Sequence, residues 1–204
     1  MRGSDNIVFK IMENFVNFII LNVIWLLFCL PVITFFPASK AMMGVSRNWV
    51  IEKVEGGVLR QFLDCFKEDF RKSFLIGLML WGIALVLWFD FGILLQAEFA
   101  GSRPLFVLLV LLSTAFIFIS IYLLFLLVTY ELSIKDLIKN SFLFSIANIV
   151  YTSIFVVIIA VSLFLVYLFP FLIVVLGSLT SYLLYLLFNR IVNTREEAKS
   201  IEET

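Results

Sequence analysis

The sequence predicts an all-α, polytopic membrane protein, and two observations support this fold class. Four stretches lack charged side chains, apart from Asp90 in the second: residues 14–39, 73–97, 104–130 and 140–189. A helix needs about 20 apolar residues to cross the roughly 30 Å hydrocarbon core of a bilayer. In addition, 63% of the 204 residues are hydrophobic, against about 45–50% in a soluble domain. We therefore expect a single membrane domain over residues 1–204.

The longest uncharged stretch decides the number of spans. It contains 50 residues between Lys139 and Arg190, and as one helix it would be roughly 75 Å long. The chain must reverse within it, and Pro170 is its strong helix breaker. The predicted spans are residues 15–36, 74–95, 105–130, 149–169 and 171–188.

The basic residues predict the orientation of these spans, because Lys and Arg are enriched in cytoplasmic loops. With five spans, twelve basic residues fall on one side and only Arg2, Lys10 and Arg103 on the other. If the last stretch crossed only once, the split would be nine against six. The count favours five spans, with the N-terminus outside, the C-terminus in the cytoplasm and the protein in the cell membrane.

Two cytoplasmic segments are predicted to form amphipathic helices that precede the second and fourth spans. In residues 59–74, apolar side chains recur at helical spacing and charged side chains occupy the opposite face. Residues 133–139 begin with Ser133 and Asp136 in a pattern that resembles a capping box. Such helices serve either as docking elements for a partner or as anchors on anionic headgroups, and the sequence leaves both open.

Composition excludes several classes of function. The chain contains no histidine, which removes histidine metal sites and histidine-activated nucleophiles. Its two cysteines, Cys29 and Cys65, define neither a disulfide framework nor a zinc site, and its zero net charge gives no support to a nucleic-acid partner. Without a phosphate loop or a serine elbow, we expect no enzyme, no metal and no cofactor.

Two polar residues inside predicted spans are candidates for function. Asp90 lies near the outer end of the second span, where a carboxylate would bind a cation, carry a proton or hydrogen-bond a sugar hydroxyl. The alternative is that it reaches the headgroups or pairs with Arg103. Asn22 lies in the body of the first span and is expected to hydrogen-bond a neighbouring helix. Gly177 and Ser181, four residues apart, predict another close helix contact.

Several short segments in the first half of the chain resemble the YesL-like family of bacterial membrane proteins. They are Leu21-Asn22, Leu30-Pro31-Val32-Ile33-Thr34, Phe36-Pro37-Ala38-Ser39-Lys40-Ala41, Phe66-Lys67-Glu68-Asp69-Phe70-Arg71-Lys72 and Phe89-Asp90. The resemblance implies a small multi-span protein, of a family often encoded beside carbohydrate-uptake genes in Firmicutes, and it supplies no catalytic residues. It places Pro31, Pro37 and Asp90 in a recurring pattern and directs attention to a cleft that they would border. The family pattern leads us to expect a small or apolar residue at position 40, and Lys40 departs from it.

Two hypotheses follow. The first is an accessory component of carbohydrate uptake or utilisation that binds a partner, such as a subunit of an ABC sugar importer, through its cytoplasmic helices. The alternative is a small transporter or channel that forms a homo-oligomer around a polar cleft lined by Asn22 and Asp90. Under both hypotheses we expect the apolar helices to be in contact with the lipid bilayer.

Overall fold

The structure is a computed structural model that describes the backbone of residues 2–52, 57–96 and 102–202, and the side chains of residues 12–52, 57–96 and 103–194. These residues form helices and short connections, so the predicted all-α class is confirmed. The α-helices are α1 (Arg2–Cys29), α2 (Phe35–Glu52), α3 (Val58–Lys67), α4 (Phe70–Gln96), α5 (Ser102–Thr129), α6 (Ile134–Ala147), α7 (Ile149–Leu168) and α8 (Ile173–Glu202).

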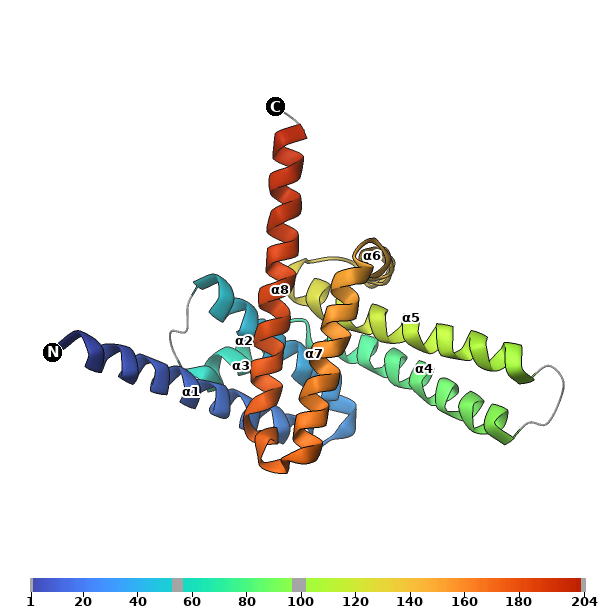
Figure 1. The fold of residues 1–204 in the computed structure, drawn as a ribbon, viewed down its shortest axis with the longest axis horizontal. Helices are drawn as coiled ribbons and strands as arrows, with labels where there is room; N and C mark the ends of the chain where they lie inside the picture. The colour runs from blue at the N-terminus through green and yellow to red at the C-terminus, as the bar shows by residue number, and fades with distance from the viewer. Residues whose placement is uncertain (1, 53–56, 97–101, 203–204) are drawn as a thin grey trace.

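Within the part of the chain that the structure describes, five helices are long and apolar enough to cross a membrane, as predicted. The qualifying segments are Met12–Cys29, Phe70–Gln96, Arg103–Thr129, Ile149–Leu168 and Pro170–Thr194. The reversal predicted at Pro170 is also confirmed, because α7 ends at Leu168 and a 3-10 turn over Pro170–Leu172 leads into α8. The two helices stand side by side as a hairpin (Figure 1).

The first span is shorter than predicted, because it ends at Cys29 and not near residue 36. Pro31 has no backbone N–H and restricts the residue before it, which stops the helix. The Thr34 hydroxyl then donates to the carbonyl oxygens of Phe28 and Pro31, at 2.6 and 2.7 Å, and closes a tight turn. The chain enters α2 directly after this turn.

Helix α2 occupies a segment that the sequence assigned partly to the first span and partly to a loop. Pro37 lies in its first turn, where a missing N–H breaks no hydrogen bond. The helix runs back along α1, since Trp25 Nε1 donates to Ser39 Oγ at 3.3 Å and the Phe18 ring packs on Trp49 with a centroid separation of 5.1 Å. The chain therefore forms an α1–α2 hairpin.

The two predicted amphipathic helices are present. Helix α3 corresponds to the first, but it ends at Lys67 and does not continue to residue 74, because the chain turns at Asp69 before α4 begins at Phe70. Helix α6 begins where the Ser133 pattern predicts. The Ser133 side chain accepts a hydrogen bond from the Asp136 backbone N–H at 3.2 Å and donates to the Asp136 carboxylate at 2.6 Å. This side chain thus caps the first turn of α6.

The contact between α1 and α8 differs from what the predicted topology requires. Phe18 packs on Tyr182, whereas Asn22, one turn later in α1, bonds Ser178 and Ile173, earlier in α8. The contacts therefore run in opposite order along the two helices. Five strictly alternating spans would instead make the first and last run in the same sense. The predicted topology lacked the reversal of the chain between α1 and α2, and the side of the membrane that each end occupies stays a prediction.

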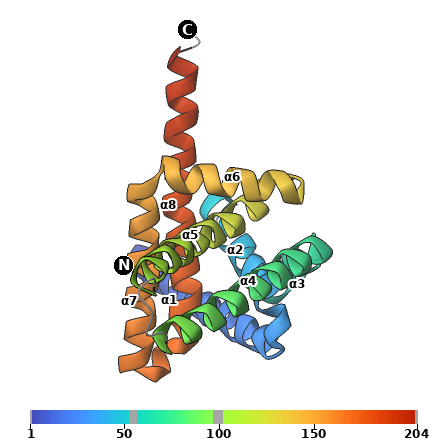
Figure 2. The ribbon, with the colours of Figure 1, turned by 90° about the vertical axis from the view of Figure 1, so that its right-hand side faces the viewer.

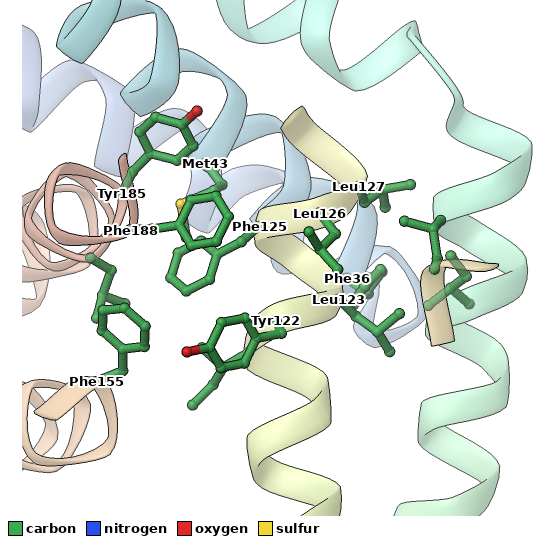
Figure 3. Packing of buried hydrophobic residues seen from close by; sticks show 14 of the residues in the cluster. Phe36, Met43, Tyr122, Leu123, Phe125, Leu126, Leu127, Phe155, Tyr185 and Phe188 are labelled. Atoms are coloured by element: carbon green, nitrogen blue, oxygen red, sulfur yellow. The ribbon is translucent and has the colours of Figure 1, made fainter. Parts of the chain in front are cut away.

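The helices diverge from a shared core. Helix α1 and the α4–α5 hairpin leave the α7–α8 hairpin in different directions (Figures 1 and 2). Where α5, α7 and α8 meet, Tyr122 and Phe125 face Phe155 and Phe188 (Figure 3). The rings of Phe125 and Phe188 stack with centroids 4.6 Å apart. A second apolar cluster joins α1, α2 and α3, and it fixes α3 beside α2.

Candidate functional site

Asn22 joins α1 to α8. Its side chain is fully buried, its amide nitrogen donates to the Ile173 carbonyl, and its Oδ1 accepts the Ser178 backbone N–H at 3.0 Å. The predicted close contact at Gly177 lies beside it, because a Cβ at Gly177 would collide with Asn22 Oδ1. Ser181, the partner of Gly177 in the predicted pair, accepts a 3.0 Å hydrogen bond from the Ser46 hydroxyl of α2. Asn22 therefore acts in helix packing.

Asp90 does not share a cleft with Asn22. Its side chain is exposed and lies in the outer part of α4, and this part of α4 projects away from α1 (Figure 1). The described residues include no ion pair between Asp90 and Arg103. A single copy of the chain thus does not form the expected cleft between Asn22 and Asp90. The two were placed together because both are polar residues in spans, but the α4–α5 hairpin diverges from α1.

Pro31 and Pro37 act on the backbone. Pro31 is exposed in the turn between α1 and α2, whereas Pro37 is buried in the first turn of α2. Neither residue lines the polar cavity that the structure forms between α2 and α3. Both prolines belong to the segments that resemble the YesL-like family, and their role in the α1–α2 turn explains why they are part of that pattern.

The polar cavity has a volume of about 430 Å³ and lies between α2 and α3, with Val128 of α5 at one side. A cavity of this size is typical of small-molecule sites. Its polar walls come from two faces. They consist of Lys40, Arg47 and Asn48 of α2 and Asp64, Cys65 and Glu68 of α3 and its C-terminal end.

Lys40 holds the end of α3. The residue is only 2% exposed, and its ammonium donates to the carbonyl oxygens of Cys65 and Glu68, at 3.0 and 2.9 Å. It also lies 3.4 Å from the Glu68 carboxylate. A cation at a helix C-terminus satisfies free carbonyl groups and complements the helix dipole. Lys40 therefore fixes the joint between α3 and α4, where Asp69 adopts a φ of 53°.

Arg47 lines the same cavity, but its hydrogen-bonding groups are less well satisfied than those of Lys40. Its Nε is buried and has no hydrogen-bond partner among the residues that the structure describes. A buried donor without an acceptor costs about 1–3 kcal/mol. The two cavity carboxylates have other cations near them, since Glu68 lies against Lys40 and Asp64 is 3.9 Å from the Nε of Arg60. Arg47 is therefore the charged side chain of the cavity lining that makes no ion pair with the residues that the structure describes.

Cys65 is packed into the α2–α3 contact. Its Sγ lies 3.0 Å from where a Cβ on Gly44 would stand, so only glycine fits there without a shift. Burial raises the pKa of the Cys65 thiol, and the positive charge of Lys40 opposes this shift. The thiol is therefore protonated at neutral pH and is a poor nucleophile.

The two amphipathic helices use their apolar faces differently. In α3, Val58, Phe62 and Cys65 are buried against α1 and α2, while its charged side chains are exposed. In α6, Phe142, Leu143 and Ile146 remain exposed. Leu137 of the same helix is fully buried in the main core, and Ile138 and Phe144 pack against it. The apolar side of α3 is thus covered by protein, whereas α6 packs on the core and leaves only part of its apolar surface exposed.

Sequence reasoning missed the cavity because it counted Lys40 and Arg47 only as loop charges. A signal was present: Lys40, Gly44 and Arg47 are spaced by four and three residues, which places them on one face of a helix. The sequence did not reveal that this face meets the end of α3.

One of the comparisons with known proteins covers the α2 and α3 residues of this site. A family model described as "Protein of unknown function, DUF624" matches residues 18–91, which contain all the α2 and α3 residues of the cavity. The chain is 31% identical to the uncharacterized protein YesL of Bacillus subtilis (strain 168) over 126 residues. The predicted resemblance to the YesL-like family is confirmed. That similarity covers 60% of this chain and 58% of YesL, so the chain spans less than two thirds of that relative.

A second relative from the same organism, the uncharacterized protein YteU, is 28% identical over 155 residues, which cover 74% of this chain and 68% of YteU. No solved structure matches the chain. The relatives' names state no substrate or partner, so function has to be argued from the geometry of this chain.

Proposed function

We propose that this protein is an accessory membrane component of carbohydrate uptake or utilisation, and that it acts by binding a partner protein through the charged face of α3. The observation that carries the proposal is that Phe62, at the centre of the apolar face of α3, is fully buried against protein. A helix that only anchored the chain to lipid would present this face to the bilayer. The outward face of α3 is therefore accessible to a partner.

The exposed face of α3 carries both signs of charge. Arg60 and Asp64 form a loose pair at 3.9 Å, with side-chain exposures of 91% and 71%, and Lys67 is exposed as well. Such pairs contribute little to stability, about 0.3–0.5 kcal/mol on a helix. Mixed charge of this kind instead steers and orients a complementary surface.

The partner that we propose is a subunit of an ABC sugar importer. The family resemblance supports this choice, because such proteins are often encoded beside carbohydrate-uptake genes. The oligomeric transporter with a cleft at Asp90 is less favoured, because Asp90 and Asn22 lie on diverging helices.

Site-directed crosslinking in native membranes tests the proposal. Arg60→Cys places a reactive thiol on the exposed face of α3, in a chain that carries Cys29→Ala and Cys65→Ala. The expected result is a crosslinked product that contains an importer permease or ATPase, identified by its peptides. Trp88→Cys, on an exposed part of α4, is the matched control and should give no such product. If neither Arg60→Cys nor Lys67→Cys captures an importer subunit at normal expression, the proposal is wrong.

A further inference from the structure

We infer that the polar cavity between α2 and α3 binds a phosphate group, carried either by a phospholipid headgroup or by a small soluble molecule. The inference does not depend on the proposed partner, because it concerns the inner wall of α3 and not its exposed face. It begins with the unsatisfied Nε of Arg47.

Any preference of the cavity for an anion depends on how its charged side chains are paired. Four of them line it, two basic and two acidic: Lys40, Arg47, Asp64 and Glu68. The ammonium of Lys40 is engaged by two carbonyl oxygens and by the Glu68 carboxylate, and Asp64 lies nearest to Arg60. Among the residues that the structure describes, Arg47 is the charged group of the lining without a counter-ion, and a guanidinium binds phosphate oxygens in a fixed, directional geometry.

The shape and position of the cavity suit a phosphate rather than a bare inorganic ion such as chloride. Its volume of about 430 Å³ exceeds what one small ion needs and leaves room for a group attached to the phosphate. Asn48 adds an amide that can donate a further hydrogen bond. The neighbouring joint of α3 and α4 carries Lys67, Arg71 and Lys72, and such a basic segment attracts anionic headgroups.

The occupant would also give Arg47 the hydrogen-bond acceptor that its Nε lacks among the described residues. A phosphate oxygen that accepts from Arg47 Nε removes the cost of a buried free donor. Binding to the folded chain alone raises the temperature of unfolding. Stability therefore reports on occupancy without any need to know an activity.

The test follows thermal unfolding of the purified full-length chain in a neutral detergent at constant ionic strength. One arm adds inorganic phosphate. The other adds phosphatidylglycerol, compared with a diacylglycerol that lacks phosphate. We expect stabilisation in at least one arm, and the arm that responds identifies a soluble or a lipid-borne phosphate. Stabilisation in neither arm overturns the inference.

Variants locate the site. Arg47→Gln should weaken the apparent affinity for the effective probe by roughly tenfold or more, since charge-assisted hydrogen bonds are the strong ones. Arg103→Gln, at an exposed arginine in α5 that is outside the cavity lining, is the matched control and should leave the affinity unchanged. Arg47→Lys keeps the charge without the guanidinium and guards against a folding failure of Arg47→Gln. An unchanged affinity in either folded Arg47 variant places the phosphate elsewhere and overturns the inference.

Discussion

The buried ammonium of Lys40 donates to the backbone carbonyl of Glu68 at 2.9 Å, in the short connection between α3 and α4. This bond connects α2, which the sequence did not reveal as a helix, to the joint that leads into the second span. The position of α3, and with it the polar cavity, depends on that joint.

Replacing Lys40 should loosen the joint. Lys40→Met keeps most of the aliphatic stem but removes the donor, and leaves the carbonyl groups of Cys65 and Glu68 without this partner. We expect a loss of about 1–3 kcal/mol in the free energy of unfolding, as for other buried acceptors that lose their donor. Denaturant titration in detergent measures it. Lys67→Met, at an exposed position of α3, is the control and should change stability by less than about 0.5 kcal/mol.

The contact of Gly177 with Asn22 predicts strong coupling between the two residues. Gly177→Ala should destabilise the α1–α8 contact, because the added methyl meets the Asn22 side chain. Asn22→Ala removes two interhelical hydrogen bonds, each worth less than about 2 kcal/mol in a membrane protein. In the double variant the methyl finds space, so the two losses should be less than additive. Additive losses in a double-mutant cycle would contradict the geometry.

A glycine replacement in an uncrowded part of the chain serves as the control for Gly177→Ala. Gly82 lies in α4, and a methyl group added to it would have nothing within 4 Å, so Gly82→Ala should be neutral or slightly stabilising. A similar loss at both glycines would mean that the close packing at Gly177 is not the cause.

Hydropathy and helix breakers predicted the parts of this fold that depend on local sequence. The lengths of the uncharged stretches revealed five apolar helices, Pro170 marked the turn between α7 and α8, and Ser133 marked the start of α6. The same reasoning failed at α2, where the polar residues Lys40 and Arg47 resembled loop charges. Their burial depends on contacts with α3 that are distant in sequence. The cavity could not be derived for that reason, and Asn22 and Asp90 were grouped although their helices diverge.

Asp90 should tolerate replacement. Its side chain is exposed and makes no ion pair with the described residues, so Asp90→Asn removes no ion pair within that part of the chain. We expect the unfolding free energy to change by less than about 0.5 kcal/mol. Denaturant titration measures it, with Asn22→Ala as the destabilised variant for comparison. A large loss of stability would show that Asp90 has a partner, such as a residue of a second copy.

The Cys65 thiol should resist alkylation. Because burial raises its pKa, less thiolate is present at any mildly alkaline pH than for an ordinary cysteine. Iodoacetamide should modify Cys65 more slowly than a cysteine introduced by Arg60→Cys, and the rate should keep rising to higher pH. Mass spectrometry of the folded chain over a pH series measures both rates. Equal rates in the folded state, as expected after denaturation, would contradict the burial of Cys65.

The opposite order of contacts along α1 and α8 predicts that both ends of the chain lie on the same side of the membrane. With α2 as the return passage, every basic residue outside α2 except Arg103 falls on the side of the C-terminus, which satisfies the preference of Lys and Arg for the cytoplasm. Single cysteines introduced by Glu13→Cys, Arg103→Cys and Thr194→Cys, in a chain free of Cys29 and Cys65, test this with a membrane-impermeant maleimide. Arg103→Cys should react in intact cells, whereas the other two should react only after permeabilisation. Labelling of Glu13→Cys in intact cells, with Thr194→Cys protected, would instead restore the alternation of five spans with the N-terminus outside.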